Sequence, residues 1–96
     1  MSVYVVAALT KTDPQAYEES GRRGRDSLSA FENSRLAADD FAVLVEGEMP
    51  APRFVLLRFD DEAAFQEWWN SEAYQEAIPF RHAAADTKFI VKFQGV

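Results

Sequence analysis

The sequence has no cysteine, and none of its hydrophobic runs is long. Without cysteine the chain has no disulfide framework, no thiolate nucleophile and no cysteine-ligated metal. No apolar stretch approaches the roughly 20 residues that a membrane-spanning helix requires. The first residues, Met1–Val6, carry neither the basic region nor the cleavage site of a secretory signal. We therefore predict a cytoplasmic protein that does not associate with a membrane.

Positive charge is also scarce. Ten Lys and Arg stand against sixteen Asp and Glu, which gives a net charge of −6. Such a chain repels phosphate backbones, so we predict no nucleic-acid partner. The one basic cluster, Arg22, Arg23 and Arg25, has no aromatic residues between its members, and we interpret it as a solvated helix face rather than an anion site.

Hydrophobic and aromatic residues, by contrast, are plentiful. They include eight Phe, three Tyr and two Trp among 96 residues, and the hydrophobic fraction is 48%. This composition supports a packed core and is not that of a disordered chain. The length corresponds to a single domain, which we place at residues 1–96.

The order of predicted elements indicates the fold class. The first half of the chain begins with a strand at Val3–Leu9, followed by a helix that Asp13-Pro14 opens and Asn33-Ser34 ends, and then by a hairpin of strands Arg35–Ala38 and Phe41–Glu46. The second half begins with a strand at Phe54–Phe59, followed by a helix capped by Asp60-Asp61. A further helix is capped by Ser71 and kinked or split at Pro79, and the last strand is Phe89–Phe93. This order is typical of an α+β, ferredoxin-like split βαβ sandwich, with an antiparallel sheet and helices on one face.

The strands are apolar on both faces. In Phe54–Phe59 one face takes Val55, Leu57 and Phe59, while the other takes Phe54, Leu56 and Arg58. The helices can cover only one face, and a bare second face is larger than the apolar patch that monomers usually expose. We therefore predict a homodimer in which two copies pack these sheet faces together.

Several motifs together resemble a known family. They are Asp13-Pro14 with Tyr17, Glu46-Gly47, a strand ending in Phe59, and Trp69, Ser71, Tyr74 and Arg81 followed by an alanine run. This pattern is similar to the family named domain of unknown function 1330, and the likeness covers nearly the whole chain. The resemblance implies a dimeric α+β barrel built from ferredoxin-like protomers, and it implies no established reaction. Ala37-Ala38-Asp39-Asp40 stands where the family usually has glycines, and His82 where it often has glutamine.

The candidate site residues lie mostly in the segment 65–85. Tyr74, Ile78, Arg81 and His82 have the spacing of one helical face. Arg81 at the edge of a core requires a counter-charge, and two alternatives stand: a structural ion pair with Glu46, or a ligand carboxylate or enolate.

His82 is the one side chain that ordinarily titrates near neutral pH, so it is the candidate general base, with Arg81 holding an anion. A lone histidine has no metal-ligand spacing, so we predict no metal and no cofactor. Glu46, Trp69 and Tyr74 are candidate ligand contacts, as is Tyr4 on a strand face that could look into the cleft.

These residues support two functional hypotheses. In the first, the protein binds a small molecule in a pocket between the sheet and the helices. In the alternative, it is a cofactor-independent enzyme, monooxygenase-like or isomerase-like, which acts on a small oxygenated or carboxylated compound with His82 as base and Arg81 as anion holder.

Overall fold

A computed structural model describes residues 1–31 and 34–96 of the chain. The predicted helix end at Asn33 lies outside these residues. The elements, in chain order, are β1 (Val3–Lys11), α1 (Pro14–Ser27), β2 (Arg35–Asp39), β3 (Arg53–Phe59), α2 (Glu62–Trp69), α3 (Glu72–Ala84) and β4 (Ala85–Gln94).

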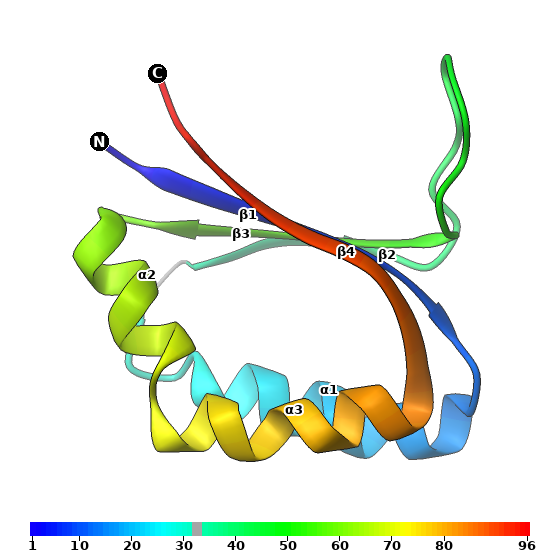
Figure 1. Ribbon diagram of the computed structural model, residues 1–96, viewed down its shortest axis with the longest axis horizontal. Coiled ribbons are helices and arrows are strands. Elements are labelled where there is room, and N and C mark those ends of the chain that lie inside the picture. The colour runs from blue at the N-terminus through cyan, green and yellow to red at the C-terminus, as the bar shows by residue number, and fades with distance from the viewer. Residues whose placement is uncertain (32–33) are drawn as a thin grey trace.

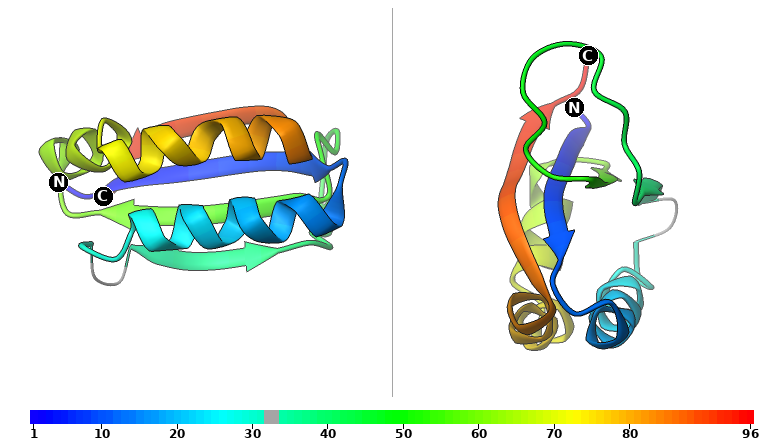
Figure 2. Two further views of the ribbon diagram at one scale, coloured as in Figure 1. Left: turned by 90° about the horizontal axis from the view of Figure 1, so that it is seen from below. Right: turned by 90° about the vertical axis from the view of Figure 1, so that its right-hand side faces the viewer.

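The described strands form one antiparallel sheet in the order β2-β3-β1-β4. Figure 1 shows this sheet nearly edge-on, with α1, α2 and α3 all beneath it. Figure 2 shows α1 and α3 side by side along the same face, which leaves the opposite face open. The predicted ferredoxin-like split βαβ arrangement, with helices on one face, is therefore confirmed.

The helix starts follow from local capping. Asp13, Asp61 and Ser71 each accept a hydrogen bond from the backbone N–H three residues later. Each bond satisfies a donor that the first turn of a helix leaves without a partner. Pro79 lies inside α3, which runs without interruption from Glu72 to Ala84, so the predicted split at this proline is wrong.

The first helix is shorter than predicted. It ends at Ser27, because the N–H groups of Leu28 and Ser29 bond to carbonyls three residues back instead of four. Such bonds tighten the last turn and end the α-helical ladder. Leu28 and Phe31 still pack on the core, but from a turn.

The predicted return strand at Phe41–Glu46 is also wrong. β2 instead pairs directly with β3, and the residues between them form a loop. Asp39 accepts a hydrogen bond from the Phe41 N–H and turns the chain out of the sheet.

The core lies between the sheet and the helices. Aromatic rings fill the end of it near α2, where the Phe59 and Trp68 rings stack at a centroid distance of 5.2 Å. Towards the other end, between α1 and α3, the layers enclose a cavity. Among the described residues, no helix is long and apolar enough to cross a membrane.

Candidate functional site

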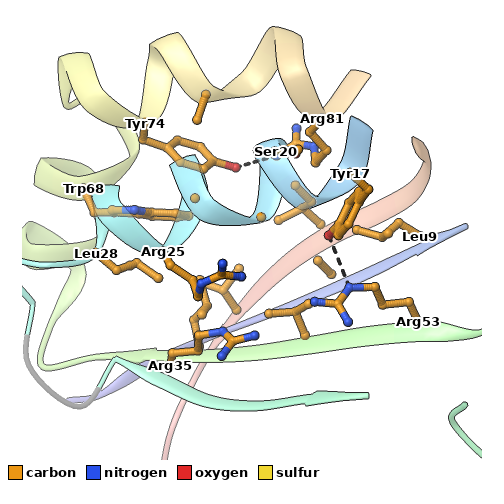
Figure 3. Close-up of a pocket in the computed structure, with 18 residues that line it drawn as sticks. Leu9, Tyr17, Ser20, Arg25, Leu28, Arg35, Arg53, Trp68, Tyr74 and Arg81 are labelled. Carbon is orange, nitrogen blue, oxygen red and sulfur yellow. Dashed lines mark hydrogen bonds between the residues drawn. The ribbon is translucent and has the colours of Figure 1, made fainter. Parts of the chain in front are cut away.

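The cavity has a volume of about 110 Å³ and lies between the helix layer and the inner face of the sheet. Its sheet side is apolar, with Val5, Leu57 and Ile90 among the lining residues. Figure 3 shows the polar lining residues, which include four arginines and two tyrosines. None of the described lining residues is acidic. The cavity therefore has mostly apolar walls, and its charged lining groups are all positive.

Tyr74 and Arg81 form the polar group on the α3 side. The Arg81 Nη1 donates a hydrogen bond to the Tyr74 hydroxyl at 2.5 Å (Figure 3). Tyr74 is buried, and burial raises the pKa of its phenol, although the positive charge of Arg81 acts in the opposite direction. The Tyr74 hydroxyl therefore keeps its proton at neutral pH and can donate a hydrogen bond to a ligand oxygen.

Arg81 itself is only partly satisfied. Its Nε is buried and has no hydrogen-bond partner among the described residues. No carboxylate of those residues forms an ion pair with it either. A half-buried guanidinium whose buried Nε has no acceptor and whose charge has no carboxylate partner is an unfavourable arrangement, and a negatively charged ligand would relieve it.

A second polar group spans α1 and β3. The Arg53 Nε donates to the Tyr17 hydroxyl at 3.2 Å, and its Nη1 pairs with Asp40 Oδ1 at 2.6 Å. Burial lowers the pKa of Arg53, but the bonds to Tyr17 and Asp40 outweigh it and raise the pKa overall. Lys11 also pairs with Asp40, at 3.1 Å. This arginine is therefore neutralised within the chain, in contrast to Arg81.

Two further arginines, Arg25 of α1 and Arg35 of β2, stand at the rim of the cavity. Both are exposed, and neither forms an ion pair with the described residues. Figure 3 shows their guanidinium groups on the same side of the cavity, one reaching down from the helix and the other up from the sheet. Their like charges favour an anion at this rim.

Gly21 and Gly24 lie within α1, and each leaves space beside the helix. Both line the cavity. A Cβ at Gly21 would lie 3.2 Å from the Arg25 Nη1, whereas a Cβ at Gly24 would meet nothing within 4 Å. Gly21 therefore leaves room for the Arg25 side chain, and Gly24 leaves part of the cavity empty.

The two tryptophans take different positions. Trp68 is buried, lines the cavity and donates from Nε1 to the Ser27 Oγ at 3.0 Å. Its ring centroid lies 4.0 Å from that of Tyr74. Trp69 is half-buried, packs on Phe65 and Tyr74, and is not among the lining residues. Trp69, a predicted ligand contact, therefore packs behind residues that line the cavity and does not itself reach the cavity.

The structure brings together two of the predicted site residues, Tyr74 and Arg81. His82 is exposed, with Nε2 3.5 Å from the Arg81 Nη2, and does not line the cavity. Neighbouring residues leave a helix about 100° apart, so Arg81 lines the cavity and His82 lies outside it, although their tips are in contact. In this conformation His82 does not face the cavity as a base would.

Tyr4 and Glu46 lie away from the cavity. Since Val5 lines it, strand alternation turns Tyr4 to the open face of the sheet, where its ring stacks on Phe93 at 6.0 Å. Glu46 is exposed in the loop between β2 and β3, which rises on that same side (Figure 1). Of the two alternatives for Arg81, the ion pair with Glu46 is not formed within one chain, because the sheet separates the two residues.

Sequence reasoning missed Arg25, Arg35 and Arg53 as cavity residues. Arg22 and Arg23 do form the solvated face predicted for them, with ion pairs to Glu19 at 2.6 and 2.9 Å. The available signal for Arg25 was its position four residues after Gly21, since a side chain at that spacing lies over the glycine.

The comparison with family models identifies the chain. The model for the domain of unknown function DUF1330 matches residues 2–94. The chain belongs to the DUF1330 family. Among curated proteins, none matches it.

Several solved structures share the fold of this chain. A protein of unknown function from Rhodopseudomonas palustris has a TM-score of 0.75 and 17% identity, over 99% of this chain and 82% of its own. A dimeric ferredoxin-like protein of unknown function from Jannaschia sp. CCS1 has a TM-score of 0.76 and 14% identity, over 99% and 100%. SnoaB, a cofactor-independent oxygenase from Streptomyces nogalater, has a TM-score of 0.69 and 14% identity, over 99% and 93%. At these identities the likeness establishes the fold of this DUF1330 member.

Proposed function

We propose that this protein binds a small organic anion, a carboxylate or an enolate on a flat apolar body, in the cavity between the sheet and the helices. The observation that carries the proposal is Arg81, whose buried Nε has no acceptor and whose charge has no carboxylate partner among the described residues. A negatively charged ligand oxygen would accept a hydrogen bond from this Nε and would also balance the charge of the guanidinium.

The size and walls of the cavity support a ligand of about one ring. An apolar cavity of roughly 150 Å³ holds benzene, and this cavity of about 110 Å³ has exposed side chains at its rim. The Trp68 and Tyr74 rings offer aromatic surface, while the Tyr74 hydroxyl offers a donor beside Arg81. The rim arginines, Arg25 and Arg35, would draw an anion towards the opening.

The test uses benzoate and 4-hydroxybenzoate as probes and benzamide as their neutral counterpart. We expect the two carboxylates to raise the melting temperature by several degrees at saturating concentration, since a ligand at about 100 times its Kd stabilises the folded state by about 2.7 kcal/mol. Benzamide should have little effect. Arg81→Gln should abolish the response, and Arg23→Gln, on the outer face of α1, should retain it. Equal responses to benzoate and benzamide would refute the anion site.

The alternative is a cofactor-independent enzyme, for which the fold of SnoaB and the Arg81–Tyr74 pair are the support. The pair would stabilise an enolate oxygen, and His82 would act as base after turning towards the cavity. Oxygen consumption with each phenolic probe that binds is the assay. His82→Ala should slow turnover by about 10²–10⁴-fold, and an unchanged rate would remove His82 as the base.

We also propose that the working form is a cytoplasmic homodimer in which two copies pack their open sheet faces. Tyr4, Leu56, Val91 and Phe93 lie on this face, and the last two are 46% and 49% exposed. The dimeric ferredoxin-like protein from Jannaschia sp. CCS1 adds support. Light scattering at micromolar concentration should give twice the mass of one chain, and the mass of a single chain would contradict the proposal.

A further inference from the structure

The loop between β2 and β3, residues 40–52, carries apolar side chains into solvent. We call it the arm. Phe41 and Val43 are each 84% exposed and Val45 is 96% exposed, while Leu44 and Met49 are exposed by 47% and 39%. Large exposed apolar side chains are thus concentrated in one short segment outside the core, which is typical of an interaction site.

The arm is fixed at its base. The Ala42 N–H donates to the Pro52 carbonyl at 3.0 Å and joins its two legs. Asp40 pairs with Lys11 and Arg53, and these two cations hold its pKa below the usual range. At the tip, Gly47 has φ +99, a conformation that favours glycine and reverses the chain. The arm therefore leaves the sheet in a defined direction.

That direction is the open side of the sheet. In Figure 1 the arm rises above the strands while the helices lie below them, and the right-hand view of Figure 2 agrees. Any protein that covers the open face from above therefore meets the arm at its border. The arm and the open face therefore lie on the same side of the molecule, and both carry exposed apolar side chains.

The area of the sheet face indicates why an arm is needed. Four strands spaced about 4.8 Å apart and roughly 25 Å long give a face of about 500 Å² per copy. Specific interfaces bury about 800 Å² per partner. The flat extent and the buried accessible area are different quantities, but the sheet face is small, and the exposed side chains of the arm rise where they can add to the buried area.

We propose that the arm of each copy packs against the second copy of this chain, and that the dimer is closed by two such arms related by the twofold axis. This inference rests on the proposed sheet-face dimer. The second copy is the occupant because the arm rises on the side of the face that the proposed dimer covers and because a twofold interface presents the same patches twice. The acidic tip, Glu46-Gly47-Glu48, lies at the polar rim of such an interface.

The experiment compares three variants of the full chain by sedimentation over a range of concentrations. The arm variant combines Val43→Ser and Val45→Ser, the face variant is Phe93→Glu, and the control is Phe80→Ser on the helix layer, where Phe80 is 38% exposed. We expect the arm variant to raise the Kd of the dimer by at least roughly tenfold, because valine burial is lost in both copies. The control should keep the wild-type Kd.

The outcomes separate the arm from the dimer. If the arm variant keeps the wild-type Kd while the face variant dissociates, the arm inference is overturned and the dimer stands. If the wild-type chain is monomeric, both are overturned. Hydrogen exchange of the wild-type arm tests the inference without substitution: the amides of residues 43–45 should exchange more slowly as protein concentration rises, and exchange that does not change with concentration overturns it.

Discussion

Gly24 lies in the last turn of α1 and lines the cavity, and its replacement by alanine tests how this wall is built. A Cβ placed there meets nothing within 4 Å, so the methyl group enters empty space without displacing a neighbour. The carbonyl of Gly24 accepts from the Ser27 Oγ at 2.6 Å, and the substitution leaves that bond intact. The helix propensity of the residue is therefore the main quantity that changes.

The expected gain follows from that propensity. Alanine is favoured over glycine by about 1 kcal/mol in a helix interior, and a position near the helix end should retain about 0.5–1 kcal/mol. For a domain of this size 1 kcal/mol corresponds to about 4–8 °C. We therefore expect Gly24→Ala to raise the melting temperature by about 2–8 °C, and to weaken benzoate binding because the methyl group occupies the cavity.

The assay is thermal unfolding at one fixed protein concentration, because dimerisation makes the melting temperature depend on concentration. Gly21→Ala is the matched comparison. Its Cβ would lie 3.2 Å from the Arg25 Nη1, so the guanidinium must move and the gain should be smaller. A Gly24→Ala variant that is no more stable than the wild type would refute the reasoning, since it would mean that another group fills the space beside Gly24.

Two further substitutions test the core and the ion pairs. Trp68→Phe removes the buried bond to the Ser27 Oγ and should cost about 1–3 kcal/mol in urea unfolding, more than Trp69→Phe at a half-buried position. Asp40→Asn should lower stability at pH 7. Lys11 and Arg53 lower the pKa of the Asp40 carboxyl in the folded state. The stabilisation by these two ion pairs is therefore present above the pKa of Asp40 in the unfolded chain, about 4, and is lost as the pH falls through its pKa in the folded state. Unfolding curves of Asp40→Asn and wild type should therefore converge in acid, and since the carboxylate is 40% exposed the whole effect is small.

The elements that sequence reasoning located correctly are those that local chemistry decides. Asp13, Asp61 and Ser71 cap helices because a short polar side chain reaches the N–H three residues ahead. Strand positions followed from runs of β-branched and aromatic residues, whose side chains pack well on a pleated surface. The order of elements then left few topologies, of which the ferredoxin-like one was predicted and found.

The errors came from choices that contacts distant in sequence decide. Phe41–Glu46 has the composition of a strand, but β2 pairs with β3 instead, and Phe41–Glu46 becomes part of the arm. Arg25 resembles its neighbours Arg22 and Arg23 in sequence, yet it folds over Gly21 towards the cavity while they pair with Glu19 on the outside.

The sequence by itself therefore determined the class of the protein: an acidic ferredoxin-like chain with two apolar sheet faces and an arginine in need of a counter-charge. Only the tertiary structure decided which groups meet. It placed Tyr74 beside Arg81, kept Glu46 and Tyr4 on the far side of the sheet, and gathered Arg25 and Arg35 at one rim. The physical reason is that a cavity is formed by residues far apart in the chain, and their separation in space depends on packing rather than on local propensity.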